Sequence, residues 1–179
     1  MEVLNDFQTS VSKALSEIDE NWKNYHGLTI CGTHSPHNWE EQIKKIKGVR
    51  ESGAPFLGVC FGHQLAAIEY ARNVLGQEDA TSEEFGEGTF VVVKRKEGLL
   101  VGLHDTVVET KYDGGLGIVS KESYWNNYEL KEGFGDVWKK APNFITVQYH
   151  PEYQSSKERP HKILVEFLQH ARDYTRKSN

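Results

Sequence analysis

The sequence predicts an α/β fold: an open, mostly parallel sheet with helices on both faces and a β-rich insertion in the middle. Short apolar runs at 28–31 and 55–59 alternate with stretches of helical periodicity, and residues 89–119 contain several strand-like runs. With 179 residues, of which 37% are hydrophobic, the chain can bury one core. We therefore expect one domain over residues 1–179.

Each element follows from its local pattern. Strands are predicted at residues 1–5, 28–31, 55–59, 89–93, 106–110, 116–119 and 144–149. Four sets of apolar and small residues recur at helical spacing: Phe7, Val11, Leu15, Ile18 and Trp22; Trp39, Ile43, Ile46 and Val49; Leu65, Ala67, Ile68, Ala71, Val74 and Leu75; and Ile163, Leu164, Phe167, Leu168 and Ala171. The first predicted strand is barely long enough, so we expect a sheet shortened at its N-terminal side.

Cys60 is the first candidate for chemistry. It stands between Gly58 and Gly62, directly after the strand-like run 55–59 and before a helical pattern. Glycines on both sides permit a sharp strand-to-helix turn, which places the sulfur at the first turn of the helix. Free N–H groups and the helix dipole favour a thiolate there, and the thiolate is the nucleophile. The alternative reading is a cysteine that only packs in the junction.

His150 and Glu152 are the second candidate pair, at the end of the strand-like run 144–149. On an extended backbone, residues i and i+2 point to the same side, so both side chains would project together. A carboxylate beside an imidazole orients it and raises its basicity. A strand end with two solvated side chains is the alternative reading. Together with Cys60, however, the pair favours a Cys–His–Glu triad.

Two motifs give this pattern a specific resemblance. Residues 58–64 (Gly-Val-Cys-Phe-Gly-His-Gln) and 148–152 (Gln-Tyr-His-Pro-Glu) resemble the class I, or triad, glutamine amidotransferase family, and within it the glutaminase domain of CTP synthases. The segments 67–85 and 150–160 extend the likeness. The resemblance implies a flavodoxin-like sheet and hydrolysis of L-glutamine to glutamate and ammonia, without a metal or an organic cofactor.

Further site residues follow from the turn and from the resemblance. The backbone N–H of Phe61 is an expected donor to the oxyanion. The resemblance implies a second donor in the loop after strand 28–31, which here contains Gly32 and Thr33; Thr33 stands where the family usually has glycine. It also implies that Glu84 binds the ammonium group of the substrate and that Gln64 borders the substrate.

One position departs from the resembled family. Glu122 falls where an arginine would hold the substrate carboxylate, and a carboxylate there is expected to repel it. Three alternatives remain open. Lys121 substitutes for the arginine, the segment 111–113 lines the pocket, or the substrate is not free glutamine.

Composition excludes several other classes of function. The net charge is −5 and the basic residues are scattered, which argues against a nucleic-acid surface. No apolar stretch approaches the ~20 residues that span a bilayer, and two cysteines are too few for a disulfide framework, so we expect a cytoplasmic protein. Cys31, His34 and His37 are possible zinc ligands, but a closed site needs four; no metal is expected.

Three functions remain compatible with the sequence. The first is a glutaminase that releases ammonia or passes it to a separate synthetase subunit, since the chain contains no Walker-type phosphate loop. The second is a hydrolase of another γ-glutamyl compound. The third is a catalytically silent binding or regulatory module. A second copy of the chain is a possible partner, because it would cover the shortened edge of the sheet.

Overall fold

The computed structural model describes residues 1–86, 88–108, 118–134 and 143–178. Its centre is a four-stranded, all-parallel sheet in the order β1-β2-β3-β7. The strands are β1 (Glu2–Leu4), β2 (Leu28–Ile30), β3 (Phe56–Val59) and β7 (Phe144–Val147). The prediction of an open parallel sheet is confirmed, and the short N-terminal run forms its edge strand.

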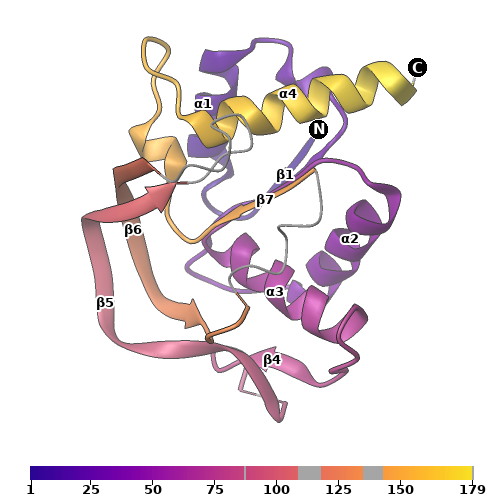
Figure 1. Ribbon diagram of the computed structural model, residues 1–179, viewed down its shortest axis with the longest axis vertical. Coiled ribbons are helices and arrows are strands. Elements are labelled where there is room, and N and C mark those ends of the chain that lie inside the picture. The colour runs from indigo at the N-terminus through magenta and orange to yellow at the C-terminus, as the bar shows by residue number, and fades with distance from the viewer. Residues whose placement is uncertain (87, 109–117, 135–142, 179) are drawn as a thin grey trace.

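Two helices cover each face of this sheet (Figure 1). The helices are α1 (Gln8–Ile18) and α4 (Lys162–Ser178) on one face, and α2 (Trp39–Ser52) and α3 (Phe61–Asn73) on the other. The side chains of β3 alternate between the faces. Phe56 packs in the core with α2 and α3, whereas Leu57 and Val59 pack in the core with α1 and α4. Burying each of these side chains contributes about 2 kcal/mol to the free energy of unfolding. Because its side chains enter both cores, β3 connects them.

Two glycines allow α3 to start directly above the sheet. A Cβ atom added at Gly62 would lie 2.0 Å from the carbonyl oxygen of Ile30 in β2, and one added at Gly58 would lie 2.8 Å from the carbonyl oxygen of Gly62. Neither position has room for a side chain, because the obstructing atoms are backbone. The glycines that flank Cys60 in the sequence are therefore required by close packing between β2, β3 and α3.

The β-rich middle of the chain forms a second sheet, β4-β5-β6 (Figure 1). Its strands are β4 (Ala80–Ser82), β5 (Phe90–Val108) and β6 (Ile118–Leu130), and the last two form a long antiparallel ribbon. The prediction of separate strands at 89–93 and 106–110 is wrong. β5 continues through the charged residues between these two runs, with an irregularity in its register against β6. Lys94 and Lys96 both form ion pairs with Glu129 across the ribbon.

The first helix is shorter than the apolar spacing predicted. It ends at Ile18, because Asp19 adopts an extended backbone, and Trp22 begins a separate 3₁₀ turn, Trp22–Asn24. Trp22 is nevertheless buried in the same core as Val11 and Leu15. The spacing therefore indicated the buried face correctly but not the end of the helix. Residues 109–110 and 116–117 of the predicted strands lie outside the described part of the chain.

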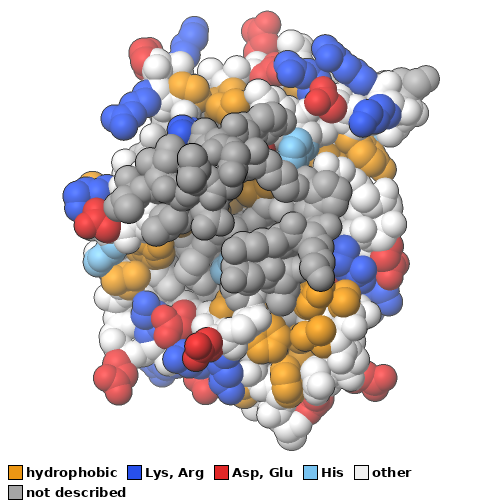
Figure 2. Space-filling view, in the orientation of Figure 1, with side chains coloured by type: hydrophobic (Ala, Val, Ile, Leu, Met, Phe, Trp, Pro, Cys, Tyr) orange, Lys and Arg blue, Asp and Glu red, His pale blue; other side chains and the backbone are white. Residues whose placement is uncertain are grey.

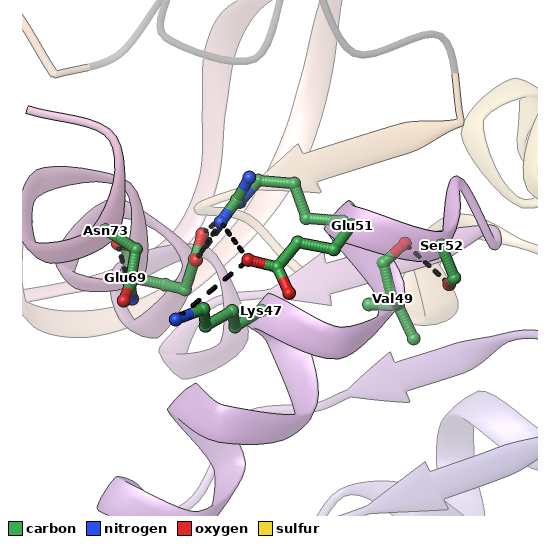
Figure 3. Close-up of polar contacts among 7 residues, drawn as sticks. Lys47, Val49, Glu51, Ser52, Glu69 and Asn73 are labelled. Atoms are coloured by element: carbon green, nitrogen blue, oxygen red, sulfur yellow. Dashed lines mark hydrogen bonds and ion pairs between the residues drawn. The ribbon is translucent and has the colours of Figure 1, made fainter.

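A buried ion pair joins α2 to α3. The carboxylate of Glu69 is fully buried, and Arg50 Nε lies 2.9 Å and 3.0 Å from its two oxygens while Arg50 NH2 lies 2.8 Å from one of them. Figure 3 shows Glu69 on α3 facing α2, with the side chain of Asn73 on the backbone carbonyl of Glu69. The hydrogen bonds that Arg50 donates to Glu69 raise the pKa of Arg50. The pair fixes how the helix that follows Cys60 lies against its neighbour.

Replacing Arg50 tests this role. Arg50→Met leaves the buried carboxylate of Glu69 without its guanidinium, so we expect the free energy of unfolding to fall by about 2 kcal/mol. Urea unfolding measures it. Arg159→Met removes an exposed arginine and is the matched control, with an expected change within about 0.5 kcal/mol. Equal stability of the two variants would contradict a structural role for the pair.

Candidate active site

The backbone at Cys60 is strained. Cys60 follows β3 and precedes α3 with φ 53° and ψ −102°, a conformation that residues with a side chain rarely adopt. Its N–H donates to the Val147 carbonyl of β7 (2.8 Å), and its carbonyl accepts from Gln64 N–H (3.2 Å). The neighbouring strand and the helix thus both hold the strained residue in place. Its side chain is almost buried, with 9% of the residue exposed.

The N-terminus of α3 is open at the sulfur. No side chain caps it, and Cys60 itself occupies the N-cap position. The N–H groups in the first turn of a helix have no acceptor within the helix, and the helix dipole makes this end positive. Phe61, the predicted oxyanion donor, is the first residue of α3. The local electrostatics therefore favour negative charge at the sulfur and beside it.

His150 and Glu152 are in direct contact and buried. Nδ1 of His150 lies 2.8 Å from Oε1 of Glu152, and the residues are 1% and 6% exposed. The extended backbone predicted for them is wrong, because residues Pro151–Gln154 form a 3₁₀ helix with His150 at its N-cap. Proline at the first helical position favours this turn. The turn, rather than strand alternation, brings the carboxylate back to the imidazole.

The environment of His150 favours its charged form. Burial lowers the pKa of the imidazole, but interactions with Cys60 and Glu152 outweigh burial and raise the pKa to about 10. Nε2 is buried and makes no hydrogen bond of standard geometry with the described residues. Nδ1–H donates to Glu152, which leaves Nε2 for proton exchange. The backbone N–H of His150 donates to the Ser123 carbonyl of β6 (2.8 Å), which fixes the residue from the other sheet.

The loop after β2 is fixed by the segment between β1 and α1. The hydroxyl of Thr33 and the backbone N–H of His34 both donate to Oδ2 of Asp6, at 2.6 Å and 3.1 Å. These hydrogen bonds lower the pKa of Asp6. The Gly32 carbonyl accepts from the N–H of Phe7 (3.4 Å), and a Cβ at Gly32 would lie 3.0 Å from Cε1 of His150. A side chain at position 32 would therefore crowd the imidazole.

A pocket of about 280 Å³ opens above the sulfur. Its lining residues are Thr33, His34, Cys60, Phe61, Gln64, Glu84, Leu99, Trp125, Asn126, Asn127 and Tyr128. Five predicted site residues are thus brought together there, while Gly32, His150 and Glu152 are buried and not part of the lining. Burial raises the pKa of Glu84.

The sequence did not indicate the role of β5 and β6 in this pocket. Trp125 is 52% exposed and its ring lies 5.9 Å from that of His34, so it stands at the rim. Asn126 donates to the Tyr128 carbonyl (2.8 Å) from the same strand. In the sequence, only the pair Asn126-Asn127 pointed to this strand, because it matches a pair of asparagines in the resembled family. Nothing in the periodicity shows that the ribbon folds over Cys60.

Glu122 does not lie in the pocket, and the expectation that it repels a substrate carboxylate is wrong. Its buried carboxylate lies 3.1 Å and 3.2 Å from Nε2 of His161, at the start of α4. The alternative that Lys121 replaces the arginine also finds no support, because Lys121 pairs with Asp105 at 2.9 Å and is outside the pocket lining. The segment 111–113 lies outside the described residues.

The possible zinc ligands do not converge. Within the part of the chain that the structure describes, no three His, Cys, Asp or Glu side chains could hold a metal ion. Cys31 is buried, and burial together with the nearby Glu152 raises the pKa of its thiol. Among the same residues, no helix is both long and apolar enough to cross a membrane. Basic and acidic side chains are interspersed around the rim of the face in Figure 2.

Known proteins share this fold and are similar in sequence over most of the chain. A CTP synthase from Pelagibacter ubique is 29% identical over 89% of the chain, and one from Methanoculleus marisnigri is 33% identical over 92%. The chain spans only 38% and 36% of these two relatives. Among solved structures, the glutaminase domain of the Trypanosoma brucei CTP synthase with bound acivicin matches with a TM-score of 0.72 and 25% identity, over 87% of this chain and 75% of that one.

A family model agrees with these individual likenesses. The model of class I glutamine amidotransferases matches residues 4–170, which run from the last residue of β1 through both sheets and into α4. The match contains Cys60, His150 and the pocket between them and the β5–β6 ribbon. The chain therefore belongs to the class I glutamine amidotransferase family.

Proposed function

We propose that the chain hydrolyses the side-chain amide of L-glutamine to glutamate and ammonia through a thioester on Cys60. One observation carries the proposal: a strained, nearly buried cysteine at an open helix N-terminus shares a site with a buried His150–Glu152 pair. A cysteine that only packs in a junction has no need of a buried charged imidazole. Membership of the family implies hydrolysis of glutamine in general, and these residues supply a chemical route for it.

The acylation step uses the charge state of His150. With a pKa of about 10, the imidazole holds a proton at neutral pH. In the proposed mechanism, the sulfur of Cys60 attacks the amide carbon as the thiolate. The oxyanion that forms accepts hydrogen bonds from the N–H groups of Phe61 and Thr33. His150 then gives its proton from Nε2 to the leaving ammonia, and the glutamyl thioester remains on Cys60.

The second half of the reaction returns the site to its starting state. Neutral His150 removes a proton from water as the water attacks the thioester carbonyl. The tetrahedral species collapses, the C–S bond breaks, and the new carboxyl group loses its remaining proton to solvent as glutamate leaves. Thiolate and imidazolium are restored. Glu152 keeps the proton on Nδ1 throughout, so that only Nε2 exchanges protons.

Glu84 and Gln64 are the proposed substrate contacts. Both line the pocket, and burial raises the pKa of Glu84. A partly buried carboxylate has few contacts with water, so a cation in the pocket is its favoured partner. Glu84 would bind the α-ammonium group of glutamine. Nε2 of Gln64 donates to the Tyr128 carbonyl and to Oε1 of Gln148. Oε1 of Gln64 is therefore the atom that would accept a hydrogen bond from the substrate.

A larger γ-glutamyl compound is the second candidate substrate. Leu99 and Trp125 place apolar surface at the rim of the pocket, and both residues are about half exposed. An amide with an apolar amine would gain contact there. For ammonia itself, we propose transfer to a synthetase, because the matched relatives are CTP synthases. Both substrates require the same nucleophile, whereas a silent module requires none.

Ammonia release tests the proposal directly. We expect the purified chain to release ammonia and glutamate from L-glutamine in equal amounts. Cys60→Ala removes the attacking atom, so its rate falls by at least about 10³-fold. Cys31→Ala is the matched control, because Cys31 is also buried but contacts no reacting atom, and it should keep activity.

The outcomes separate the three functions. Equal ammonia release by Cys60→Ala and the unaltered chain would exclude Cys60 as the nucleophile. A higher kcat/KM for γ-glutamyl-p-nitroanilide than for glutamine, again lost in Cys60→Ala, would favour the second substrate. Turnover of neither, in the presence of a folded Cys60 site, would favour the silent module.

The raised pKa of His150 predicts how stability depends on pH. The folded state favours the imidazolium, so this contribution to the free energy of unfolding is complete below pH 6.5 and is lost as pH rises through about 10. Glu152→Gln keeps the shape of the side chain and removes its charge. We therefore expect a lower pKa for His150 in that variant and a smaller loss of stability between pH 6.5 and 10.

Two measurements check this pH dependence. An NMR titration of the imidazole C–H of His150, assigned with His150→Asn, reports the midpoint in the unaltered chain and in Glu152→Gln. Thermal unfolding across the same range reports the stability. A midpoint at or below 6.5 in the unaltered chain would contradict the imidazolium that the mechanism requires.

A further inference from the structure

The side-chain amide of Gln148 lies against the sulfur of Cys60, and the mechanism above gives it no role. Gln148 follows β7 directly and precedes His150 by two residues. Its Nε2 lies 3.6 Å from Sγ of Cys60, at hydrogen-bonding distance for sulfur. The sulfur thus has a side-chain donor that comes from the end of β7.

The neighbours of Gln148 determine which of its two amide atoms faces the sulfur. A backbone carbonyl only accepts hydrogen bonds, so the Gln64 atom 3.3 Å from the Tyr128 carbonyl is the nitrogen. That nitrogen also lies 3.2 Å from the side chain of Gln148, where it needs an acceptor, which must be Oε1. The remaining amide atom of Gln148, beside Cys60, is therefore the NH₂ group. The Tyr128 carbonyl thus determines the orientation of both amide groups.

We propose that Gln148 is a catalytic residue that stabilises the thiolate of Cys60 by donating a hydrogen bond to it, and that Gln64 is the positioning residue that holds Gln148 in this orientation. The inference rests on the proposed function, because it takes Cys60 as the nucleophile. A hydrogen bond to an ionised acceptor is about twice as strong as one between neutral groups. The contact therefore stabilises the thiolate more than the thiol.

A second contact of the sulfur also distinguishes the thiol of Cys60 from its thiolate. The Trp125 carbonyl lies 3.9 Å from Sγ and can only accept the proton of a thiol. When the sulfur ionises, this contact is lost, whereas the contact with Gln148 strengthens. The β6 carbonyl therefore favours the thiol, and the donor on the β7 side favours the thiolate.

The same donor also acts in the second half of the reaction. Thioester formation removes the charge from sulfur, so the contact weakens while glutamate is attached. Collapse of the second tetrahedral species expels the thiolate, and the N–H of Gln148 lies where that charge returns. An interaction stronger with the charged leaving group than with the thioester accelerates this step.

Alkylation of Cys60 isolates this effect from substrate binding. Iodoacetamide is small and reacts with the thiolate, and its incorporation at Cys60 is read by mass spectrometry of the peptide at pH 7. In Gln148→Met the side chain keeps its length but has no donor. We expect its alkylation rate and its kcat to fall about tenfold or more, with a smaller change in KM. Gln148→Glu is isosteric and adds a negative charge, so the loss is larger.

Two further variants complete the experiment. Gln64→Met lowers alkylation of Cys60 although Gln64 does not touch the sulfur, because Gln148 is no longer held. Gln8→Met is the matched control: Gln8 is exposed at the start of α1, outside the pocket lining, and its replacement leaves both rates unchanged. Circular dichroism and thermal unfolding confirm that each variant is folded.

The results discriminate between the inference and the function on which it rests. Alkylation and kcat of Gln148→Met at the rates of the unaltered chain would overturn the role of Gln148. Unchanged alkylation of Gln64→Met would overturn its positioning role. If Cys60 in the unaltered chain reacts no faster than Cys31 in urea-unfolded protein, or if Cys60→Ala still hydrolyses glutamine, the proposed function itself fails.

Discussion

The close approach of α3 to the parallel sheet is the constraint on which the site depends. Gly62 lies so near the Ile30 carbonyl that a Cβ atom would come within 2.0 Å of it, and Gly58 is equally confined by the backbone of Gly62. The chain can reach this arrangement only by turning sharply between them, which puts Cys60 at φ 53°. The strain is therefore a consequence of packing, and the hydrogen bond from Cys60 N–H to β7 maintains it.

The same constraint explains why the residues of the site meet. β3 and β7 are parallel neighbours, with Val59 opposite Val147, so both chains leave the sheet at the same edge. Cys60 follows one strand at once, and Gln148 and His150 follow the other within three residues. The 3₁₀ turn at Pro151 then returns Glu152 to the imidazole. One oxygen of the buried carboxylate, Oε1, is paired with the imidazole there.

The β5–β6 ribbon completes the site from the other sheet. Three backbone carbonyls of β6 contact site residues: Ser123 accepts from His150, Tyr128 from Gln64, and Trp125 lies against the sulfur. The buried contact between Glu122 and His161 fastens this strand to the start of α4. Glu122, which was expected from the sequence to lie against the substrate carboxylate, thus helps to hold the strand that accepts a hydrogen bond from His150.

The sequence predicted the parts of the fold and site that depend on local pattern. The parallel sheet and its four helices followed from periodicity, and Cys60 followed from its two glycines. The long strand β5 was missed because its charged residues are paired across a solvated ribbon, which local pattern does not reveal. The turn after His150 and the contacts of Gln148 and Glu122 depend on tertiary neighbours. They depend on the contacts of β6 with α3 and with the 3₁₀ turn at Pro151, which no local pattern reveals.

Capture of the glutamyl thioester tests the central claim most directly. The chain is mixed with excess L-glutamine carrying a carbon isotope label, quenched in acid during turnover, and digested. The account predicts one glutamyl group on the peptide that contains Cys60, absent from Cys60→Ser and increased in a variant slowed in the second half of the reaction. Steady turnover with no label on Cys60, or label on another residue, would contradict it.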